Sequence, residues 1–165
     1  MSNLNCTMRP ATADDLPRME QIRVAAFAPV FASFQSILGD TIYRHAQAHE
    51  DAEQGDLLVA QMEPGSVWDM FVAELDREIV GFVSVRLDRE HLFGEIGLNA
   101  VDPTHAGQGL GTQMYEFANA RMKEAGMKVS TVATGGDPSH AAARRAYAKA
   151  GFDVQIPSTW MCRTL

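Results

Sequence analysis

Hydrophobic positions in the first third of the chain recur at the spacing of amphipathic helices. Apolar residues near every third or fourth position run from Leu16 to Phe27, and Thr12 or Asp14 can begin that helix. A later run of the same kind is interrupted by Gly39. The predicted elements of this part are a short strand within 5–12, a helix over 12–31, a second helix over about 33–48 and an acidic loop at 50–56.

From residue 69 onward the pattern changes to short runs rich in β-branched and aromatic residues, which are typical of strands. The stretch 69–88 contains two such runs joined at Asp76, Arg77 and Glu78, which predicts a hairpin. The elements predicted after it are a strand over 92–101, a helix from Leu110 to about Gly126, a strand over 128–134, a helix that begins at Asp137 and Pro138 and ends at Gly151, and two last strands at 152–156 and 159–165.

The order of these elements predicts the fold class. Alternating strands and helices in the second half require parallel crossovers, whereas hairpins pair antiparallel. We therefore expect a single domain over 1–165 of the α/β class, an α+β sandwich with a mixed, mostly antiparallel central sheet flanked by helices. The expected order is β-α-α-β-β-β-α-β-α-β-β.

Charge and composition restrict the function classes. The 165 residues have a formal net charge of −7, which argues against nucleic-acid binding because phosphates attract basic surfaces. A negative surface suits a cationic substrate and equally serves solubility. The N-terminus lacks a basic start followed by an apolar run, and no stretch approaches the ~20 apolar residues of a membrane helix. We expect a cytoplasmic protein with no membrane partner.

Cysteine and histidine positions give little sign of a metal site. Cys6 and Cys162 lie near opposite ends of the chain without CxxC spacing or a histidine neighbour, which predicts reduced thiols. His45 and His49 have the spacing of metal ligands on a helix, but no third ligand accompanies them. We expect no bound metal.

Three glycines, Gly107, Gly109 and Gly111, stand between a predicted strand and a predicted helix. A glycine costs roughly 0.5–1 kcal/mol relative to alanine within a helix, so the pattern needs a compensating reason. Free N–H groups and the helix dipole make such a junction an anion site, and phosphate is its natural ligand. Packing alone also places glycines at strand–helix junctions, so this alternative stays open.

Two nucleotide-binding motifs differ from this turn. A Walker loop needs Lys and then Ser or Thr after its last glycine, whereas Thr112 and Gln113 follow Gly111. A dinucleotide fingerprint needs G-x-G-x-x-G and a later acidic residue for the ribose, and the G-Q-G-L-G turn meets neither requirement. A nucleotide- or flavin-binding protein is the weaker alternative.

The segment 95–118, "EIGLNAVDPTHAGQGLGTQMYEFA", resembles the acetyl-CoA signature of the GNAT superfamily of N-acetyltransferases. The segment 139–152, "SHAAARRAYAKAGF", is similar to the family's N-x-x-A-x-x-x-Y-x-x-x-G-F ending, and "MRPATADDL" near the start looks like its opening strand–helix turn. The close resemblance covers about 92–152. This chain departs from the family at two positions, with Ala106 in place of Gln or Arg and His140 in place of the helix asparagine.

The resemblance implies a GNAT-like fold, acetyl-CoA as the cosubstrate, and transfer of its acetyl group to a primary amine by direct attack. Backbone amides of 107–112 would hold the pyrophosphate, and His140 would replace the amide that touches the pantetheine arm. The cofactor-binding residues that the resemblance implies are Val101, Ala106, Gly107, Gln108, Gly109, Leu110, Gly111, Thr112, His140, Ala143 and Tyr147.

Tyr147 is the expected general acid. Helical spacing places it on one face with His140 and with Ala143 or Arg144, and members of the resembled family use this tyrosine position to protonate the leaving thiolate. A packing residue with its hydroxyl at the rim is the alternative. Arg144 and Arg145 could reach the coenzyme phosphates, but a solvated helix face is the simpler interpretation.

Glu95 is the expected general base. Regular alternation along its strand would put Glu95, Gly97, Asn99 and Val101 on one face. The histone-acetylating branch of the resembled family has its base at the equivalent place, whereas many other relatives have a glutamate that only contacts substrate or the sheet edge. In that fold the strand is bulged, and a backbone N–H near Val101 polarises the thioester carbonyl.

The expected acceptor is a small-molecule or peptide amine whose identity stays open. The helices of 14–62 should form its pocket, and Phe27, Phe31, Phe34 and Tyr43 either wall that pocket or belong to the core. A non-catalytic acyl-CoA-binding regulatory or sensing domain is the alternative function. A homodimer is compatible with the sequence.

Overall fold

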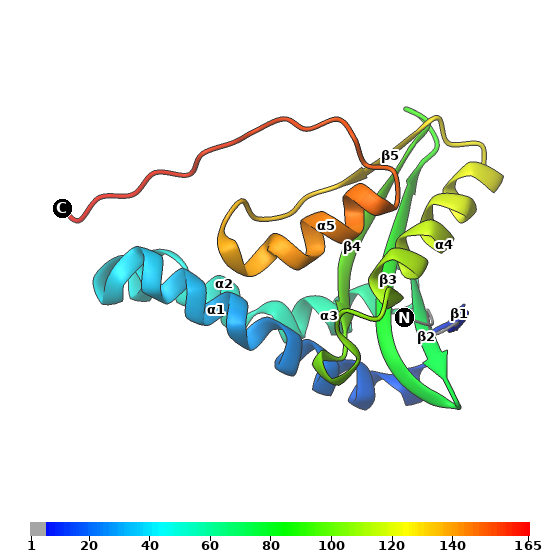
Figure 1. The fold of residues 1–165 in the computed structure, drawn as a ribbon, viewed down its shortest axis with the longest axis horizontal. Coiled ribbons are helices and arrows are strands. Elements are labelled where there is room, and N and C mark those ends of the chain that lie inside the picture. Colours follow the sequence, from blue (N-terminus) through cyan, green and yellow to red (C-terminus); the bar gives the residue numbers. More distant parts are fainter. Residues whose placement is uncertain (1–5) are drawn as a thin grey trace.

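The computed structural model describes residues 6–165 and contains one five-stranded sheet with the spatial order β1-β2-β3-β4-β5 (Figure 1). Its strands are β1 (Thr7–Pro10), β2 (Trp68–Leu75), β3 (Glu78–Asp88), β4 (Phe93–Val101) and β5 (Val129–Val132). The first four strands pair antiparallel in chain order, and β5 pairs parallel with β4. The expected mixed, mostly antiparallel sheet is confirmed. β1 lies within the expected segment 5–12, of which residue 5 is outside the described residues.

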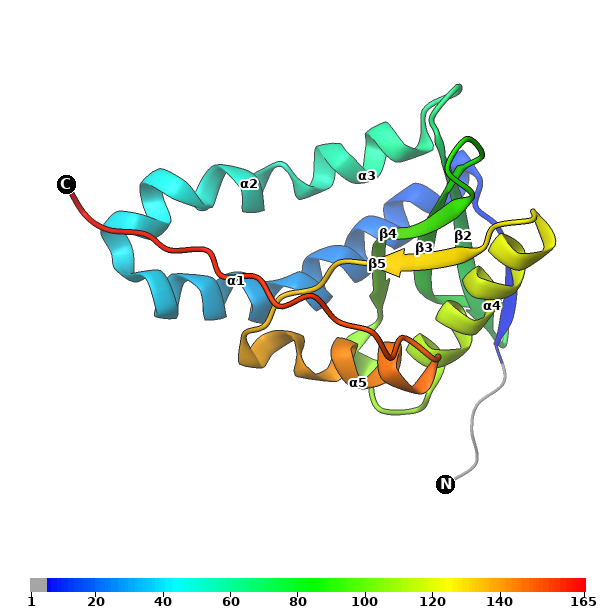
Figure 2. The same cartoon turned by 90° about the horizontal axis from the view of Figure 1, so that it is seen from above.

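Helices cover both faces of this sheet. On one face lie α1 (Leu16–Ala46) and α3 (Gln54–Met62), linked by α2 (Ala48–Ala52), and on the other face lie α4 (Leu110–Glu124) and α5 (Ala141–Lys149) (Figure 2). Short 3-10 turns at Ala13–Asp15, Pro103–His105 and Pro138–His140 precede α1, α4 and α5. Figure 2 also shows the far end of α1 and the start of α2 projecting beyond the sheet.

Each helical layer has its own apolar core against the sheet. Ile96 and Met114 belong to the core on the α4 and α5 side, and Leu58 belongs to the core on the α1 and α3 side. Adjacent residues of β3 supply both cores, because Val83 faces one and Phe82 the other. Burial of both faces explains why the middle of this strand is almost continuously hydrophobic.

The helical region before β2 is longer than the sequence pattern predicts. The two expected helices form one element, α1, kinked at Gly39, where the backbone has φ +71° and ψ 164°. The prediction of an acidic loop at 50–56 is wrong, because these residues lie almost entirely in α2 and α3. Buried Asp51 accepts hydrogen bonds from Tyr43 Oη and Gln47 Nε2, both at 2.8 Å. Neighbouring side chains therefore take the place of water around this acidic residue.

The two last expected strands, 152–156 and 159–165, are not formed. After α5 the chain follows an extended path, and every residue from 153 onward is exposed (Figure 1, orange to red). A strand requires backbone partners from another strand, and no strand within residues 6–165 pairs with this segment. The sheet therefore ends at β5, and the expected element order is wrong at its end. Cys162 in this segment and Cys6 before β1 are both free thiols, as expected.

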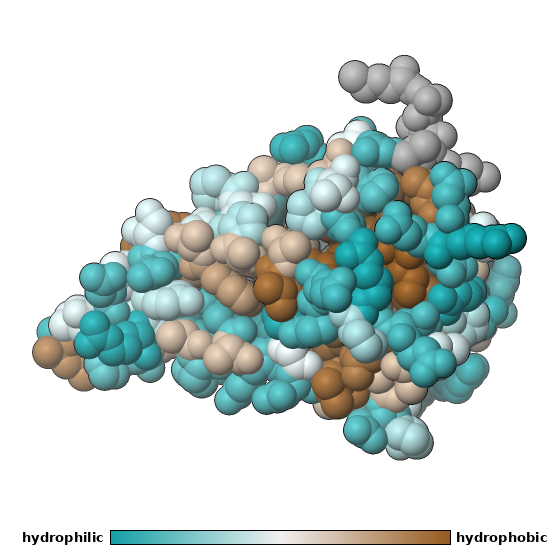
Figure 3. Space-filling view, turned by 90° about the horizontal axis from the view of Figure 1, so that it is seen from below, coloured by the Kyte–Doolittle hydropathy of each residue, from teal (hydrophilic) through white to brown (hydrophobic). Residues whose placement is uncertain are grey.

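The segment Ala13–Ala46 is long and apolar enough to cross a membrane by length and composition alone, with a mean hydropathy of 1.4 in its apolar window. The expectation that no stretch approaches this length was wrong. Only 11% of that window is buried, and Figure 3 shows brown and tan residues among teal ones along the narrow part of the molecule. At its beginning α1 packs on the sheet through Met19 and Ile22.

Candidate active site

The glycine turn lies between the end of β4 and the start of α4. Gly107 and Gly109 have φ values of +76° and +85°, in the left-handed region that other residues adopt only with strain. Gly111 differs, because a Cβ added there would make only ordinary contacts with Ala146 and Tyr115. The backbone conformation itself therefore requires two of the three glycines.

Gly109 is also the N-cap residue of α4. It has no side chain that could accept a hydrogen bond from the helix, so the N–H groups of 110–112 have neither an intrahelical acceptor nor a side-chain cap. Leu110 is 1% exposed and anchors this first turn to the core. Converging N–H donors and the positive end of the helix dipole make this helix end suited to an anion.

Asp102 fixes the turn to the rest of the molecule. Its carboxylate accepts hydrogen bonds from the N–H and Oγ1 of Thr104 at 2.9 and 2.6 Å and from Arg18 Nη2 at 2.5 Å. Its own N–H donates to the Val80 carbonyl at 2.8 Å. The Thr104 side chain first, and then the Thr104 N–H and Arg18, lower the pKa of Asp102 against the opposing effect of burial. Asp102 thus connects the turn to α1 through its charged carboxylate and to β3 through its backbone N–H.

β4 contains a bulge at Gly97. The register of β3 against β4 shifts between Val83 and Val85, so two residues of β4, one of them Gly97, lie opposite Ser84. A Cβ added to Gly97 would lie 2.4 Å from the ring of Trp68 and 2.7 Å from Ser84 Oγ, so a larger residue there would have to displace these side chains. The bulge expected in this strand is present.

The bulge overturns the alternation expected along β4. Glu95 lies opposite Arg86 on the α1 and α3 side of the sheet, whereas Asn99 contacts α4 and α5. The single face expected for Glu95, Gly97, Asn99 and Val101 does not exist. An extra residue in a strand reverses the side to which the following side chains project.

Asn99 joins β4 to both helices of the opposite layer. Its side-chain N–H groups donate to Tyr147 Oη at 3.1 Å and to the Gly97 carbonyl at 2.9 Å. Tyr115 Oη donates to Asn99 Oδ1 at 2.8 Å. The ring centroids of Tyr115 and Tyr147 are 4.3 Å apart, and Phe152 packs edge-on against Tyr147. Tyr147 is therefore held close to the bulge of β4.

Burial keeps the two tyrosine hydroxyls protonated. It raises the pKa of Tyr147, and the hydrogen bonds with Tyr115 and Asn99 oppose that rise. Burial also raises the pKa of Tyr115 well above its ordinary value, and the adjacent Tyr147 adds to this shift. A hydroxyl that stays protonated at neutral pH can act as a proton donor.

Asn99 and Tyr115 were missed as members of this group. The available signal was weak: Asn99 is a polar residue in a mostly apolar strand, and Tyr115 lies one helical turn after Gly111. Only the packing of α5 against both α4 and β4 brings Tyr115 and Asn99 to Tyr147.

Glu95 forms an ion pair on the other face of the sheet. Arg86 Nε and Nη2 both contact Glu95 Oε2, at 3.1 and 2.5 Å. The Arg86 guanidinium lies 5.5 Å from the ring centroid of Trp68 and 6.0 Å from that of Phe93. The side chains of Arg86 and Glu95 are 37% and 31% exposed, so solvent reaches the carboxylate.

His140 lies just before α5 and is tied to Asp137. Its Nδ1 is 2.5 Å from Asp137 Oδ1, and its ring stacks on Phe34 of α1 with centroids 5.9 Å apart. Asp137 Oδ2 also accepts hydrogen bonds from Ser33 Oγ at 2.9 Å and from the Ser139 N–H at 3.0 Å. Burial alone would raise the pKa of Asp137, but its hydrogen bonds outweigh that effect and lower the pKa. These contacts join α1 to the N-terminal end of α5.

The other polar candidates have separate surroundings. Arg144 Nη1 donates to the carbonyls of Gly135 and Asp137 at 2.5 and 2.8 Å, so it closes the loop before α5 and is not simply solvated. His45 belongs to α1 and His49 to α2. Among residues 6–165, no group of three or more His, Cys, Asp or Glu side chains could hold a metal ion.

The aromatic side chains of α1 contact different parts of the molecule. Phe27 and Phe31 pack edge-on with centroids 5.9 Å apart, and Phe27 lies against the α1 and α3 core. Phe34 stacks on the His140 ring, and Tyr43 binds Asp51. Phe34 is thus the member of this set that contacts an expected cofactor-binding residue.

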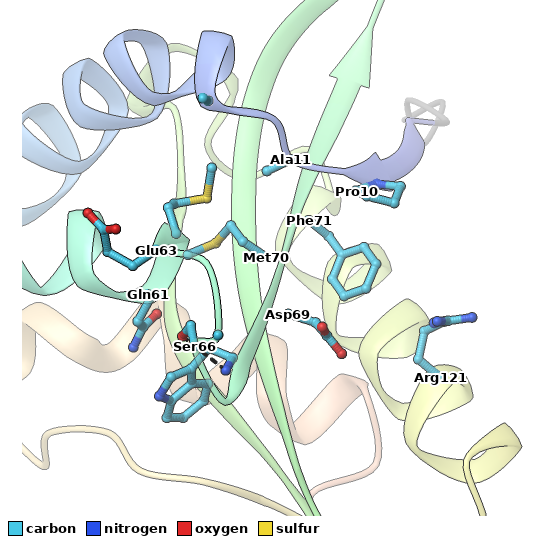
Figure 4. A pocket seen from close by; sticks show the side chains of 13 residues that line it. Pro10, Ala11, Gln61, Glu63, Ser66, Asp69, Met70, Phe71 and Arg121 are labelled. Atoms are coloured by element: carbon cyan, nitrogen blue, oxygen red, sulfur yellow. Dashed lines mark hydrogen bonds between the residues drawn. The ribbon is translucent and has the colours of Figure 1, made fainter.

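A cavity of about 460 Å³ lies at the beginning of β2 (Figure 4). Its lining includes Gln61, Trp68, Asp69, Phe71 and Arg121, and none of the expected cofactor-binding residues. Figure 4 shows Phe71 and Asp69 of β2 and Arg121 of α4 on one side of the strand, with Gln61 on the other. This cavity is therefore separate from the glycine turn.

Comparison with known proteins identifies the fold. A profile of the Acetyltransferase (GNAT) family matches residues 32–152, and no curated protein sequence matches the chain. A GNAT family acetyltransferase from Brucella melitensis, solved in complex with acetyl-CoA, is similar with a TM-score of 0.59 and 19% identity, over 86% of this chain and 81% of that one.

Two further solved structures share the fold. The ribosomal-protein-S18-alanine N-acetyltransferase from Escherichia coli has a TM-score of 0.66 and 18% identity, over 92% of this chain and 80% of that one. The aminoglycoside acetyltransferase meta-AAC0020 from an uncultured soil metagenomic sample, in complex with sisomicin, has a TM-score of 0.59 and 17% identity, over 97% and 96%. The architecture is that of the acetyltransferases. By the family profile, the chain belongs to the GNAT acetyltransferase family.

Proposed function

We propose that this protein transfers an acetyl group from acetyl-CoA to a primary amine in the cytoplasm. The observation that supports this proposal most strongly is the N-terminus of α4, where Gly109 leaves the first N–H groups without a cap. Tyr147, a buried proton donor, is held by Asn99 on the same side of the sheet. An anion site next to an acid suits a thioester that carries a diphosphate. The family and the neighbour in complex with acetyl-CoA support the same cosubstrate.

The residues present fit acetyl-CoA. The backbone N–H groups of 107–112 would bind the pyrophosphate, and Ala106 leaves this task to the main chain alone. The N–H near Val101 would polarise the thioester carbonyl. His140 and the small Ala143 would line the path of the pantetheine arm.

The reaction requires two proton transfers. An alkylammonium with a pKa of about 10.4 must lose a proton before its nitrogen attacks the thioester carbonyl carbon. The carbon–sulfur bond then breaks and the sulfur leaves with the electron pair. We assign Glu95 to accept the amine proton, directly or through water, and Tyr147 to protonate the sulfur.

The two assigned residues approach the reaction from different sides. Glu95 lies on the α1 and α3 side of β4, and Tyr147 lies on the α4 and α5 side. The amine would then enter from the α1 and α3 side, and the sulfur would leave on the other side. The bulge at Gly97 lies between Glu95 and Asn99 in the chain. Because of this bulge, the side chains of Glu95 and Asn99 project to opposite faces of the sheet.

The nature of the acceptor follows from weaker indications. One structural neighbour is named for a ribosomal protein alanine, and another holds the aminoglycoside sisomicin. The net charge of −7 favours the approach of cationic amines. The acceptor class to test first is therefore a cationic small-molecule or peptide amine.

Calorimetry and a thiol-release assay test the proposed function. We expect acetyl-CoA to bind, and we expect at least one amine class to raise CoA release roughly tenfold or more above hydrolysis. The panel would contain peptides with a free N-terminal alanine, aminoglycosides and polyamines. Binding of acetyl-CoA without stimulation by any amine would instead favour an acyl-CoA-binding regulatory domain. No heat on addition of acetyl-CoA would contradict the cofactor assignment.

Glu95→Gln tests the general base. We expect turnover to fall roughly 10²-fold near pH 7 and much less near pH 10, because the free amine fraction rises with pH and needs no base. The matched control is Glu74→Gln, which also removes a carboxylate charge from a strand ion pair, with Arg9 at 3.1 Å. Equal rate losses at both pH values, or the same loss in the control, would leave Glu95 a structural role.

A further inference from the structure

Three side chains form a row across the sheet on its α1 and α3 side. Trp68 of β2 lies opposite Arg86 of β3, and Arg86 lies opposite Glu95 of β4. Phe93, two residues before Glu95 on β4, flanks the same arginine. The pairing of the strands therefore places one arginine between two aromatic rings and one carboxylate.

Arg86 makes the contacts that a bound organic cation would make. Its Nε and Nη2 both reach Glu95 Oε2, at 3.1 and 2.5 Å. Its guanidinium carbon lies 5.5 Å from the ring centroid of Trp68 and 6.0 Å from that of Phe93. Carboxylates and aromatic faces are the two kinds of group that recognise alkylammonium and guanidinium ions. The protein thus already holds a cation of its own at this place.

The arginine is held in a way that permits exchange. The side chains of Arg86 and Glu95 are 37% and 31% exposed, and an ion pair that solvent reaches contributes little to stability because water competes for both charges. The guanidinium stands at the end of a long flexible side chain, so it can move into solvent without a change of the backbone. Its displacement by another cation therefore leaves no buried charge without a partner.

A buried hydroxyl beside this row has no hydrogen-bond partner. Ser84 Oγ is inaccessible to solvent and makes no hydrogen bond within residues 6–165. A Cβ added to Gly97 would lie 2.7 Å from Ser84 Oγ and 2.4 Å from the Trp68 ring, so the hydroxyl, the ring and the bulge meet at one point. Buried polar groups are nearly always hydrogen-bonded. The unpaired hydroxyl indicates that a ligand or water completes the structure around Trp68.

We propose that Arg86 occupies the amine subsite of this chain, and that a cationic acceptor must displace it from Glu95 and from the two rings. The inference rests on the proposed function, which assigns Glu95 to accept the amine proton. An attacking amine must come within hydrogen-bond distance of that carboxylate, where the Arg86 guanidinium already lies. A guanidinium stays protonated and cannot take up the proton itself. Arg86 is thus an internal competitor, which selects acceptors that can satisfy both a carboxylate and an aromatic face, as polyamines do.

Calorimetry in the absence of acetyl-CoA tests this competition, with spermidine as the probe. Arg86→Gln should lower the Kd for spermidine roughly tenfold, which is the gain expected if the arginine fills the subsite about nine tenths of the time. Glu95→Gln should raise the Kd roughly tenfold, because it removes the charge that holds the cation. The second result shows that the probe binds at Glu95.

Arg121→Gln is the matched control. Arg121 of α4 also pairs with a carboxylate, Glu124 at 3.7 Å, and lies 5.8 Å from a ring centroid, that of Phe71. The control removes the same charge from the chain and should leave the Kd within about twofold. Melting curves check that each variant is folded, and Arg86→Met, which keeps the aliphatic part of the side chain against Trp68, replaces Arg86→Gln if that variant unfolds.

Three results would overturn the proposal. Equal tightening in Arg86→Gln and Arg121→Gln would show a general effect of net charge. Unchanged or weaker binding in Arg86→Gln would show that Arg86 does not compete with the amine. Absence of spermidine binding to both the unsubstituted protein and Arg86→Gln would show that the row is no cation site.

Turnover separates this inference from the proposed function. In the thiol-release assay, Arg86→Gln should lower the KM for a stimulating amine roughly tenfold while kcat stays within about twofold. If no amine stimulates CoA release but Arg86→Gln still binds spermidine more tightly, the acetyl transfer is wrong and the competition at Glu95 stands. If amines stimulate release but Arg86→Gln changes neither KM nor Kd, the transfer stands and the competition is wrong.

Discussion

Replacement of Gly109 by valine should weaken acetyl-CoA binding by at least about tenfold, which corresponds to roughly 1.4 kcal/mol. Gly109 has φ +85° and caps α4 with no side chain of its own. A β-branched residue there is strained, and its methyl groups would stand beside the N–H groups of 110–112 that we assign to the pyrophosphate. Isothermal titration calorimetry of variant and unsubstituted protein measures the effect.

Gly126→Val is the matched control for this substitution. Gly126 has φ +86° at the opposite end of the same helix, and a Cβ added there meets nothing within 4 Å. Both variants should lose similar stability from backbone strain, and only Gly109→Val should lose acetyl-CoA affinity. If the two variants bound acetyl-CoA equally well, the pyrophosphate would not lie on this helix end.

Tyr147→Phe should lower kcat roughly 10²-fold while the Kd for acetyl-CoA stays within about twofold. The substitution removes the hydroxyl that would protonate the leaving sulfur and keeps the ring between Tyr115 and Phe152. Burial raises the pKa of Tyr147 above its ordinary value of 10.0. A decline in rate caused by loss of this proton should therefore begin only above about pH 10.

Tyr115→Phe separates catalysis from structure in this cluster. This substitution also removes a hydroxyl, which donates a hydrogen bond to Asn99 Oδ1 at 2.8 Å. It keeps the ring that lies against Tyr147. We expect its kcat to change only a few-fold, because Tyr147 keeps its proton. A comparable loss in both variants would mean that the tyrosines only position Asn99, and an unchanged kcat in Tyr147→Phe would remove Tyr147 from the mechanism.

Local patterns in the sequence predicted much of the fold. The hairpin expected at Asp76, Arg77 and Glu78 is present, although Glu78 already belongs to β3. Asp76 and Arg77 have positive φ, as a two-residue turn between twisted strands requires. The helix after the glycines also agrees with the structure. Asp137 has a capping role as expected, but it caps the 3-10 turn Pro138–His140, and α5 itself begins at Ala141. These features depend on residues a few positions apart, so the sequence contains the information that specifies them.

The prediction of strands at 152–156 and 159–165 was wrong because strand formation does not depend on local residues alone. Their residues have strand propensity, but propensity only permits a strand, and pairing with a neighbouring strand forms it. The prediction of an acidic loop at 50–56 was wrong in the opposite direction, because this segment is more ordered than its composition indicates. Tyr43 and Gln47 donate hydrogen bonds to the Asp51 carboxylate, so this acidic residue is accommodated within the helices. In both cases contacts with other parts of the structure outweighed the local pattern.

The sequence by itself determined the class of sheet, the glycine turn before α4 and the presence of Tyr147 in a helix that follows β5. Only the tertiary structure decided which residues act together. One extra residue in β4 reverses the face of the sheet to which the side chains after Gly97 project. That reversal sends Asn99 to the tyrosines and leaves Glu95 with Arg86 on the other face. Side-chain direction beyond a bulge depends on pairing with β3, which no periodicity within β4 can reveal.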